Sequence, residues 1–384
     1  MRSISRGCRI LSLLLPAILM SGMGCQTRPM TAVELSTQMP AVAAEIDSAD
    51  YATRICASRK LNMRDPQVAN LAMPYLIRLL KSEKKYVPEK AAYLLSEAGP
   101  TAVPAVPALV EAMGDPRASV RKNAIFAIWH IGPGAKEAIP ALVKALDDRS
   151  GGVCAQAASA LAVFGPDARL AIPRLIRLLD AKYSNDSDYF GLDWRHHEAA
   201  ALALGAIGPE AKDAVPILIR RCRERVSESF IFALGRMGPA AKEAVPVIVA
   251  ALEGRLQISA LNALGDIGED AAPAIPAIAK RLDDPQTRLS ALRALAKIGP
   301  AAVPALVEEL GNADPHRRAY GAIALGRMGP AAQAALPSLA ALRGDTARGG
   351  PDFSSAAMPH SVGQWASYAA DCIGGREPLK DLLR

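Results

Sequence analysis

The sequence predicts an all-α fold, a right-handed solenoid of about nine to ten short antiparallel helix pairs. Hydrophobic residues make up 51% of the 384-residue chain but aromatic residues only 4%, so the apolar content is mostly the small and branched side chains of closely packed helices. Period-2 runs of β-branched and aromatic residues, the mark of strands, do not occur in the sequence. A Gly-Pro dipeptide recurs at nearly constant spacing, which indicates a repeat protein.

The first 24 residues are expected to be an export signal rather than part of the fold. Arg2, Arg6 and Arg9 precede an apolar run from Ile10 to Met20, which is the arrangement of a secretory signal. The run has about eleven residues, whereas a helix that crosses a bilayer needs about 20. We therefore predict an exported protein, periplasmic or attached to the membrane, without a lasting transmembrane helix.

The junction from Ser21 to Cys25 resembles a bacterial lipoprotein signal, with a small residue directly before the Cys. In that family the Cys becomes the lipid-modified N-terminus, so the resemblance implies a membrane anchor at Cys25. The family pattern has Leu three residues before the Cys, where this chain has Gly22. Ordinary signal cleavage at the same junction is the alternative.

Charge and cysteine content exclude some classes of function. Removing residues 1–24 deletes three arginines and no acid, so the net charge falls from +7 to +4; because this is far from the clustered charge of a nucleic-acid binder, no nucleic-acid partner is expected. The cysteines after Cys25 are Cys56, Cys154, Cys222 and Cys372. They show neither CxxC spacing nor a His at metal-ligand spacing, so they are expected to be buried thiols.

Eight glycines, here called the helix-ending glycines, define the repeat. They are Gly99, Gly132, Gly165, Gly208, Gly238, Gly268, Gly299 and Gly329. Seven of them precede Pro, and successive spacings are 33, 33, 43, 30, 30, 31 and 30 residues. A second Pro lies eight residues after the Gly in seven of the eight copies. A pattern this regular predicts one supersecondary unit used repeatedly.

Each Gly-Pro is expected to end one helix, and the second Pro to begin the next. Apolar residues recur eight, five, four and one positions before the Gly, as they do from Ala200 to Ile207, which is one face of a helix. Gly suits the left-handed residue that ends a helix, and Pro cannot continue one. Pro is tolerated at the first helical position because an N–H there has no partner in the helix.

This unit resembles the short HEAT repeat of the phycobilisome-lyase-like class, as the stretch from Val120 to Val143 illustrates. The resemblance covers about residues 66–343 and implies a HEAT-repeat solenoid over that range. HEAT arrays serve many unrelated ends, so the resemblance says little about activity.

Both ends of the array are expected to carry caps, because a solenoid must cover its terminal repeats. Residues 25–65 are predicted to contain a linker and a capping helix, with helices at about 41–61 and 66–82 forming an atypical first pair. Residues 361–384 are predicted to supply capping helices, with Gly374 in the helix-ending place.

Two insertions interrupt the period. Residues 344–360 are rich in Gly, Ser and Ala and are expected to be flexible, with no assigned function. The other insertion, residues 180–194, holds four of the 17 aromatic residues: Tyr183, Tyr189, Phe190 and Trp194. Exposed aromatic side chains on a loop are good anchors for a partner. Packing back over the groove is the alternative.

A basic stripe is expected along the second helices. Positions four and five residues after the second-helix Pro are predicted to face the concave side, which HEAT families commonly use for binding. Basic residues at or beside these positions are Lys144, Arg174, Arg177, Arg220, Arg221, Lys280 and Arg281. Such a stripe would bind a protein or an anionic envelope polymer through charge-assisted hydrogen bonds. An ordinary solvated helix face is the alternative.

One group of residues, His196, His197 and Glu198, suggests an enzyme. The HEAT-fold deoxyhypusine hydroxylases carry His-Glu pairs on several repeats and bind two irons with them, whereas only one repeat has such a pair here. His197 also precedes Gly205 by eight residues where that family has seven, and one residue turns a helix by about 100°. We therefore expect no catalytic residues, no metal or other cofactor, and no small-molecule ligand.

The sequence thus predicts a non-catalytic scaffold at the bacterial cell envelope, which binds a partner through its concave helix face and the aromatic insertion. The alternative is an enzyme of the HEAT-fold class, resembling either the hydroxylases or the bilin lyases. A purely structural spacer is a third possibility.

Overall fold

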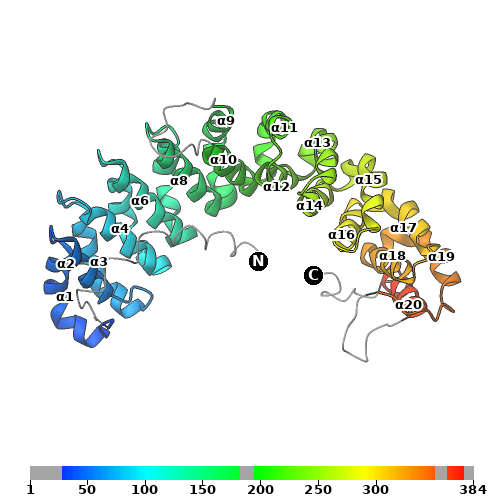
Figure 1. Cartoon of the computed structure of the whole chain (residues 1–384), viewed down its shortest axis with the longest axis horizontal. Helices are drawn as coiled ribbons and strands as arrows, with labels where there is room; N and C mark the ends of the chain where they lie inside the picture. The colour runs from blue at the N-terminus through cyan, green and yellow to red at the C-terminus, as the bar shows by residue number, and fades with distance from the viewer. Residues whose placement is uncertain (1–27, 182–193, 351–360, 376–384) are drawn as a thin grey trace. The chain divides into compact units, whose positions relative to one another are not determined.

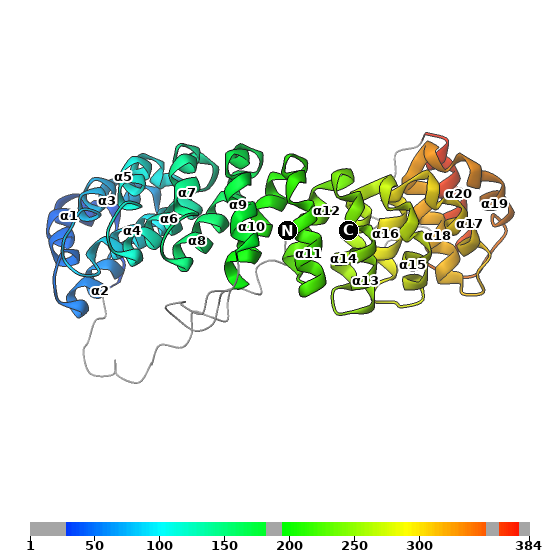
Figure 2. The same cartoon turned by 90° about the horizontal axis from the view of Figure 1, so that it is seen from above.

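The computed structural model describes residues 28–181, 194–350 and 361–375 (Figures 1 and 2). These residues are built from helices and contain no strand, apart from one isolated bridge between Arg348 and Ser361. The chain divides into two compact units at the boundary between Ala105 and Val106. The predicted all-α fold is confirmed.

Unit 1 holds the N-terminal helices. They are α1 Ala32–Ile46, α2 Tyr51–Arg59, α3 Pro66–Leu79, α4 Val87–Ala98 and the 3₁₀ helix η1 Gly99–Ala105. Three of these helices have a side-chain N-cap: Thr31 for α1, Asp50 for α2 and Asp65 for α3. Each cap gives a hydrogen-bond acceptor to an N–H group that has no partner inside its helix.

The N-terminal cap differs from the prediction in one respect. The sequence predicts one helix over about 41–61, and the structure has two, α1 and α2. The Asp50 carboxylate accepts a hydrogen bond from the Thr53 N–H at 2.7 Å, so a new helix starts inside the predicted one. The helix predicted over 66–82 is confirmed as α3.

Unit 2 repeats a first helix, a 3₁₀ turn and a second helix. The first helices are α6 Ala118–Ile131, α8 Gly151–Leu161, α10 Trp194–Ile207, α12 Glu228–Arg236, α14 Gln257–Ile267, α16 Arg288–Ile298 and α18 Pro315–Met328. The second helices are α5 Val106–Ala112, α7 Ile139–Ala145, α9 Ile172–Asp180, α11 Val215–Glu224, α13 Val245–Ala250, α15 Ile275–Ala279, α17 Val303–Leu310 and α19 Leu336–Ala341. The 3₁₀ helices are η2 Gly132–Ala138, η3 Ala162–Ala171, η4 Pro209–Ala214, η5 Gly238–Ala244, η6 Ala251–Glu253, η7 Gly268–Ala274, η8 Lys280–Leu282, η9 Pro300–Ala302 and η10 Gly329–Ala335. The last described helix is α20 Val362–Ile373.

The role predicted for the helix-ending glycines is confirmed. All eight have a positive φ, from 53° at Gly165 to 88° at Gly299, a conformation that L side chains adopt only with strain. The second-helix Pro lies in the first turn of its helix, as Pro140 does in α7. The connection between the two helices is itself a 3₁₀ helix in most copies, as is frequent for short connecting segments.

The first and second helices of unit 2 form two rows. Figure 1 shows α9, α11, α13 and α15 along the outer row and α10, α12, α14 and α16 along the inner row. Neighbouring first helices approach closely: a Cβ added to Gly235 would lie 2.7 Å from Ala263 Cα, and one on Gly205 would lie 2.8 Å from Ala233 Cα. Backbones at this distance leave no room for a side chain at these two positions. The glycines therefore allow neighbouring first helices of the inner row to pack closely.

The C-terminal cap is one helix, α20, within the described residues; residues 376–384 lie outside them. The Gly374 N–H bonds the Ala370 carbonyl and so ends α20 where predicted. The described part of the 344–360 insertion is tied to unit 2, because the Trp365 indole N–H donates to the Gly349 carbonyl at 3.1 Å and Trp365 is fully buried. The prediction of flexibility therefore does not hold for residues 344–350.

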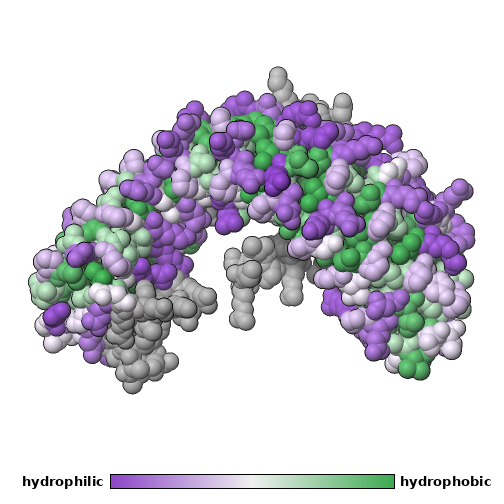
Figure 3. Space-filling model, turned by 180° about the vertical axis from the view of Figure 1, so that it is seen from behind, coloured by the Kyte–Doolittle hydropathy of each residue, from purple (hydrophilic) through white to green (hydrophobic). Residues whose placement is uncertain are grey.

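The surface mixes polar and apolar residues. Figure 3 shows hydrophilic side chains over most exposed helix surfaces, with hydrophobic residues in separate patches between them. Within the described ranges, no helix has both the length and the apolar character needed to cross a bilayer.

Candidate functional site

The residue type at one position near the start of each first helix differs between repeats. It lies eleven residues before the helix-ending glycine, and we call its occupant the edge residue. The edge residues of unit 2 are Arg121, Cys154, His197, Ser227, Gln257, Arg288 and Arg318. Their side chains lie beside the loop through which the chain arrives from the preceding second helix.

Arg121 shows what an arginine does at this position. Its Nη1 donates to the Asp115 and Pro116 carbonyls at 2.9 and 3.1 Å. Its Nε and Nη2 donate to the two Asp148 carboxylate oxygens, both at 2.7 Å. The Arg121 side chain is only 7% exposed. A buried bidentate pair of this kind joins the loops on either side of one repeat.

Arg318 repeats the arrangement near the C-terminal end of the array. It donates to the Asn312 and Ala313 carbonyls at 2.8 and 2.9 Å, and to the Asp345 carboxylate at 2.9 Å. Asp345 and Asp148 both lie sixteen residues after a helix-ending glycine. We call this combination of edge arginine and acid the edge pair.

In the repeat of α10 and α11 the edge residue is His197, whose side chain is shorter. Its Nε2 lies 2.9 Å from the Ala181 carbonyl oxygen, at the place that the Asp115 carbonyl occupies two repeats earlier. Because a carbonyl only accepts, Nε2 carries the proton. The 3.5 Å contact between this Nε2 and Arg221 Nη2 therefore joins two donors and is not a hydrogen bond.

Arg221, from the second helix α11, supplies the guanidinium that this repeat lacks. Its Nε donates to the Leu179 carbonyl and its Nη2 to the Ala181 carbonyl, both at 2.9 Å. Its Nη1 donates to Glu224 at 2.8 Å, and Glu224 lies sixteen residues after Gly208, in the place of the edge acid. Arg221 thus replaces the edge arginine from the opposite helix.

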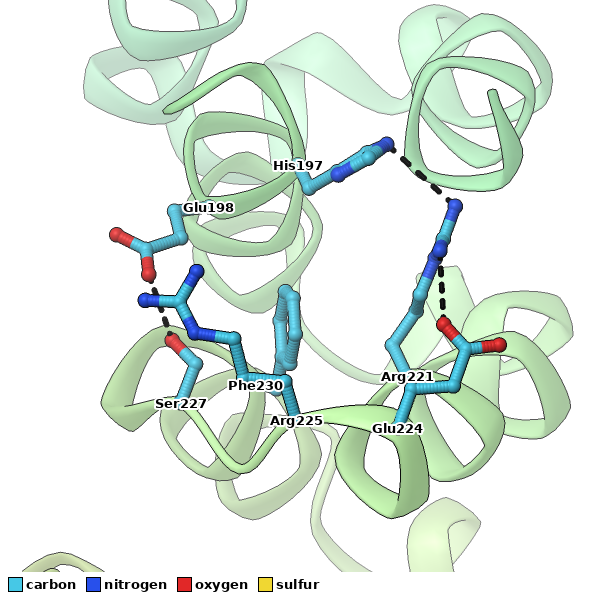
Figure 4. Close-up of a pocket in the computed structure, with 7 residues that line it drawn as sticks. All are labelled: His197, Glu198, Arg221, Glu224, Arg225, Ser227 and Phe230. Carbon is cyan, nitrogen blue, oxygen red and sulfur yellow. Dashed lines mark hydrogen bonds and ion pairs between the residues drawn. The ribbon is translucent and has the colours of Figure 1, made fainter. Parts of the chain in front are cut away.

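This replacement leaves a cavity of about 140 Å³ between α10, α11 and α12 (Figure 4). Its lining residues are His197, Glu198, Arg221, Glu224, Arg225, Ser227 and Phe230. Figure 4 shows Arg225 reaching toward Glu198 and Ser227, and the Ser227 hydroxyl donates to Glu198 at 3.0 Å. The cavity is therefore lined by charged side chains of both signs beside Phe230.

A second hollow adjoins the first, in the next repeat. There the edge residue is Ser227 and the place of the edge acid is taken by Gly254, so two short residues stand where Arg121 and Asp148 stand elsewhere. The hollow shares Glu198, Arg225 and Ser227 with the first cavity. The two adjoining cavities, in repeats that both lack an edge arginine, form what we call the edge recess.

Burial keeps His197 neutral. It lowers the pKa of His197 to about 4, with the charges of His196 and Arg221 acting in the same direction and the hydrogen bond to Ala181 opposing them. Figure 4 shows His197 and Glu198 pointing away from each other, so the pair does not converge on one point. Among the described residues no cluster of His, Cys, Asp or Glu could hold a metal ion.

The predicted basic stripe is differently placed from the expectation. It lies on second helices, which form the outer row of unit 2 (Figure 1), and not on the inner side. The reason is the glycine-mediated contact between first helices, which the sequence analysis did not use. Arg221 does not belong to the exposed stripe, because its side chain is buried and lines the edge recess.

Most of the other arginines in the stripe pair with an acid of the preceding repeat. Arg174 and Arg177 contact Asp147 at 2.7 and 3.5 Å. Arg220 pairs with Asp180, and Arg281 pairs with Glu253. Lys144 and Lys280 are exposed and form no ion pair with any described residue. The stripe is therefore largely a set of bridges between repeats, with little uncompensated positive charge.

Most of the aromatic insertion and the predicted lipidation site lie outside the described residues. Tyr183, Tyr189, Phe190 and Cys25 lie outside the described residues. Trp194 is the first residue of α10, and its side chain is also outside the description. These predictions stay predictions.

Three cysteines are buried free thiols, as predicted: Cys154, Cys222 and Cys372. Burial raises the pKa of Cys154 to about 11 and that of Cys222 to about 12, so neither is a thiolate at neutral pH. Cys56 was expected to be a buried thiol as well, and this is wrong, because it is disulfide-bonded. Its partner lies outside the described residues, which is why spacing within the repeats did not indicate it.

The edge recess was not predicted from the sequence. Part of its signal is in the repeat: eleven residues before the glycine, the arginine of other repeats is replaced by His197 and Ser227 at the recess, but also by Cys154 and Gln257 outside it. Aligning that position therefore marks a wider stretch of the array than the recess. Arg225 and Phe230 carry no such signal, because only folding places them at the cavity.

A model of HEAT repeats matches residues 106–186 and 273–349. The fold is an all-α HEAT-repeat solenoid. No curated protein matches the sequence.

Several solved structures are similar to this chain. A structure of Kap95p with RanGDP has a TM-score of 0.58 at 10% identity, covering 91% of this chain and 52% of that one. A structure of importin beta has a TM-score of 0.52 at 14% identity, and the match covers 81% of this chain and 48% of that one. The complex of CpcE and CpcF of phycocyanin lyase from Nostoc sp. PCC7120 has a TM-score of 0.39 at 26% identity, and the match covers 61% of this chain and 91% of that one. The HEAT solenoid spans about half the length of the Kap95p and importin beta chains, and the likeness to them concerns the fold alone.

Proposed function

We propose that this protein is a non-catalytic interaction scaffold of the bacterial cell envelope, which binds a protein partner at the edge recess. The observation that carries the proposal is the edge recess itself, which lies where the repeats of His197 and Ser227 lack the edge pair. In the repeats of Arg121 and Arg318 the edge pair closes the surface, whereas here polar groups of both charges line an open recess. Recesses with convergent polar groups are where proteins recognise ligands and partners.

The fold and the position of the recess support a protein as the partner. HEAT solenoids generally bind proteins through extended surfaces, and the similar structures include Kap95p with RanGDP and Kap95p with Nup1. His197 and Arg221 of the recess contact the carbonyl of Ala181, the last described residue before the sequence segment with Tyr183, Tyr189 and Phe190. Aromatic residues are frequent anchors of protein interfaces.

The proposed location at the envelope rests on the arginine-led apolar run from Ile10 to Met20. The Cys56 disulfide fits such a location, because disulfides persist in oxidising compartments. Once residues 1–24 are removed, Cys25 is the one cysteine left that could pair with Cys56, and a Cys25 thiol in a disulfide cannot also carry a lipid. Lipid anchor and disulfide are therefore alternatives at Cys25, and mass measurement of the mature N-terminus separates them: a diacylglycerol-modified Cys25 would support the anchor, whereas a Cys25–Cys56 disulfide would remove it.

The experiment for the scaffold is a capture of partners from detergent-solubilised envelopes, with bound species identified by mass spectrometry. The edge variant combines Arg225→Glu with Glu228→Lys, two exposed residues of the recess, and leaves the net charge unchanged. The matched control is Arg177→Glu in the outer row. We expect a protein that binds wild type and the control and is lost from the edge variant at an unchanged melting temperature.

Two results would overturn the proposal. Capture that is equal for wild type and the edge variant would remove the edge recess as the binding surface. Purified protein that carries a stoichiometric metal or tetrapyrrole, seen by metal analysis and absorbance, would favour an enzyme instead.

A further inference from the structure

The inner row of unit 2 has a solvent face with its own pattern, distinct from the edge recess. Exposed residues on the first helices are spaced by four, as Glu228, Phe232 and Arg236 are on α12, and so lie on one face of each helix. This face is turned away from the second helices, which cover the opposite side. We call it the inner face.

Four large apolar side chains lie exposed on consecutive helices of the inner face. They are Leu202 on α10, Phe232 on α12, Ile258 on α14 and Leu289 on α16, with 40%, 44%, 50% and 37% of their surface exposed. Leu202 and Phe232 each lie six residues before a helix-ending glycine, and Ile258 and Leu289 each lie ten before one. Corresponding positions on neighbouring helices lie side by side, so Leu202 adjoins Phe232, and Ile258 adjoins Leu289 one turn nearer the start of their helices. We call the four side chains of these two adjoining pairs the apolar row.

Basic residues follow the apolar row one turn further along the helices. Arg236 comes four residues after Phe232, and Arg293 four residues after Leu289. Over the last two turns of α12, α14, α16 and α18 the charged residues are Arg236, Asp266, Arg293, Lys297 and Arg327. Four are positive and one is negative, and the one acid is paired with Lys297 at 2.6 Å. The flank of the apolar row therefore carries a net charge of +3.

The three arginines of this flank have no acidic partner among the described residues. No hydrogen bond or ion pair links the side chains of Arg236, Arg293 or Arg327 to any described group. The Arg293 Nε is buried and has no hydrogen-bond acceptor. Burial and the neighbouring charge of Arg327 lower the pKa of Arg293. Most arginines of the outer row, in contrast, pair with acids.

We infer that the inner face of α10 to α18 binds an acidic amphipathic helix of a protein partner, with its apolar side on the apolar row and its carboxylates on Arg236, Arg293 and Arg327. Packed helices lie about 8–10 Å apart, so the row spans about 24–30 Å. A helix rises about 1.5 Å per residue, so about 16–20 residues cover that length. Apolar anchors give such a complex its affinity, and the guanidinium groups select for acid.

This inference rests on the proposed scaffold function and names a partner class for a second surface, beside the edge recess. The test uses the mature chain and fluorescently labelled helical peptides of about 18 residues. The first peptide carries Leu on one face and Glu on the other, the second has Lys in place of every Glu, and the third has Ser in place of every Leu. Binding is followed by fluorescence anisotropy at physiological salt.

We expect the Leu/Glu peptide to bind at least about tenfold more tightly than either of the other two peptides. The double variant Arg293→Glu, Arg327→Glu should reverse the preference toward the Lys peptide, and Ile258→Ser should weaken both amphipathic peptides. Arg177→Glu in the outer row is the control and should leave all affinities unchanged. Melting curves establish that each variant remains folded.

Three results would overturn the inference: equal binding of the Glu and Lys peptides, an unchanged preference in the double variant, or tight binding of the peptide without Leu. Stronger binding of anionic vesicles or of polyphosphate than of any peptide, abolished by the same double variant, would assign the surface to a polymer or lipid instead. The proposed function fails separately, because the edge variant leaves the apolar row and Arg236, Arg293 and Arg327 unchanged.

Discussion

The repeats α6–α7 and α10–α11 have the same helices and the same helix-ending glycine, yet one is closed at its edge and the other open. In the first, Arg121 reaches from the first helix to Asp148 and to two loop carbonyls. In the second, His197 is too short to do this, and Arg221 reaches the same loop from the second helix. The comparison shows that, where His197 and Arg221 stand in place of Arg121 and Ala145, the structural cation comes from the second helix and the edge is open.

Removing the edge arginine of the closed repeat should have the largest effect. Arg121→Ala leaves Asp148 buried without its partner and two carbonyls without donors, so we expect a loss of about 3–5 kcal/mol. Denaturant unfolding followed by circular dichroism measures it, with Arg121→Lys as a partial rescue. A loss below about 1 kcal/mol would mean that the edge pair does not hold the repeat together.

Removing the replacement arginine should cost less. Arg221→Ala frees the Leu179 and Ala181 carbonyls, but its acid, Glu224, has half of its side chain exposed and remains hydrated. We expect a loss of about 2–3 kcal/mol in the same assay. If Arg221→Ala were neutral and affected only partner capture, Arg221 would belong to a binding surface, as the sequence analysis predicted.

Restoring the closed arrangement should rescue that loss. In the double variant His197→Arg, Arg221→Ala, an edge arginine can again reach the Ala181 carbonyl and Glu224, so we expect about 1–2 kcal/mol to return relative to Arg221→Ala alone. A crystal structure of the double variant should show the cavity partly filled. No rescue would mean that the edge position is not equivalent in the two repeats.

Acidification should weaken the two repeats in different pH ranges. The pKa of His197 is lowered from 6.5 to about 4, so the unfolded chain binds the extra proton first and stability falls as the pH drops from about 6.5 to about 4. Burial raises the pKa of Asp148, but hydrogen bonds from Arg121 and the Ser150 N–H outweigh burial and bring this pKa below 3.8. The stability that the ionised Asp148 contributes is therefore lost only as the pH falls below about 3.8.

Unfolding measured against pH in wild type and His197→Gln tests this difference. The variant should lose the slope between pH 6.5 and 4 and keep the steeper loss at lower pH. An identical pH profile for the two proteins would show that His197 is not held neutral by the fold.

The outer-row ion pairs should have the smallest effect. Arg174 and Asp147 are both well exposed, and exposed pairs contribute about 0–1 kcal/mol. We expect Arg174→Ala to shift stability by less than about 0.5 kcal/mol in the unfolding assay. A loss as large as that of Arg121→Ala would show that bridges between second helices, rather than edge pairs, hold the repeats together.

The predictions drawn from the sequence succeeded where a local rule acts on each repeat separately. Helix-ending glycines and second-helix prolines act through their own backbone, so the sites at Gly132 and Pro140 could be assigned without any neighbour. The basic stripe failed in its placement because the side on which a second helix lies depends on how closely the first helices approach. That approach is set by pairs such as Gly235 and Ala263, which come from different repeats.

The sequence by itself determined the helices, their ends and the HEAT-like repeat, because these follow from periodicity and backbone preference within about 30 residues. Only the tertiary structure decided that Arg221 is buried, that Cys56 is disulfide-bonded and that Arg236, Arg293 and Arg327 form no ion pair with a described residue. The physical reason is that charge compensation and close packing depend on which residues of neighbouring repeats come together. A pattern within one repeat does not contain that information.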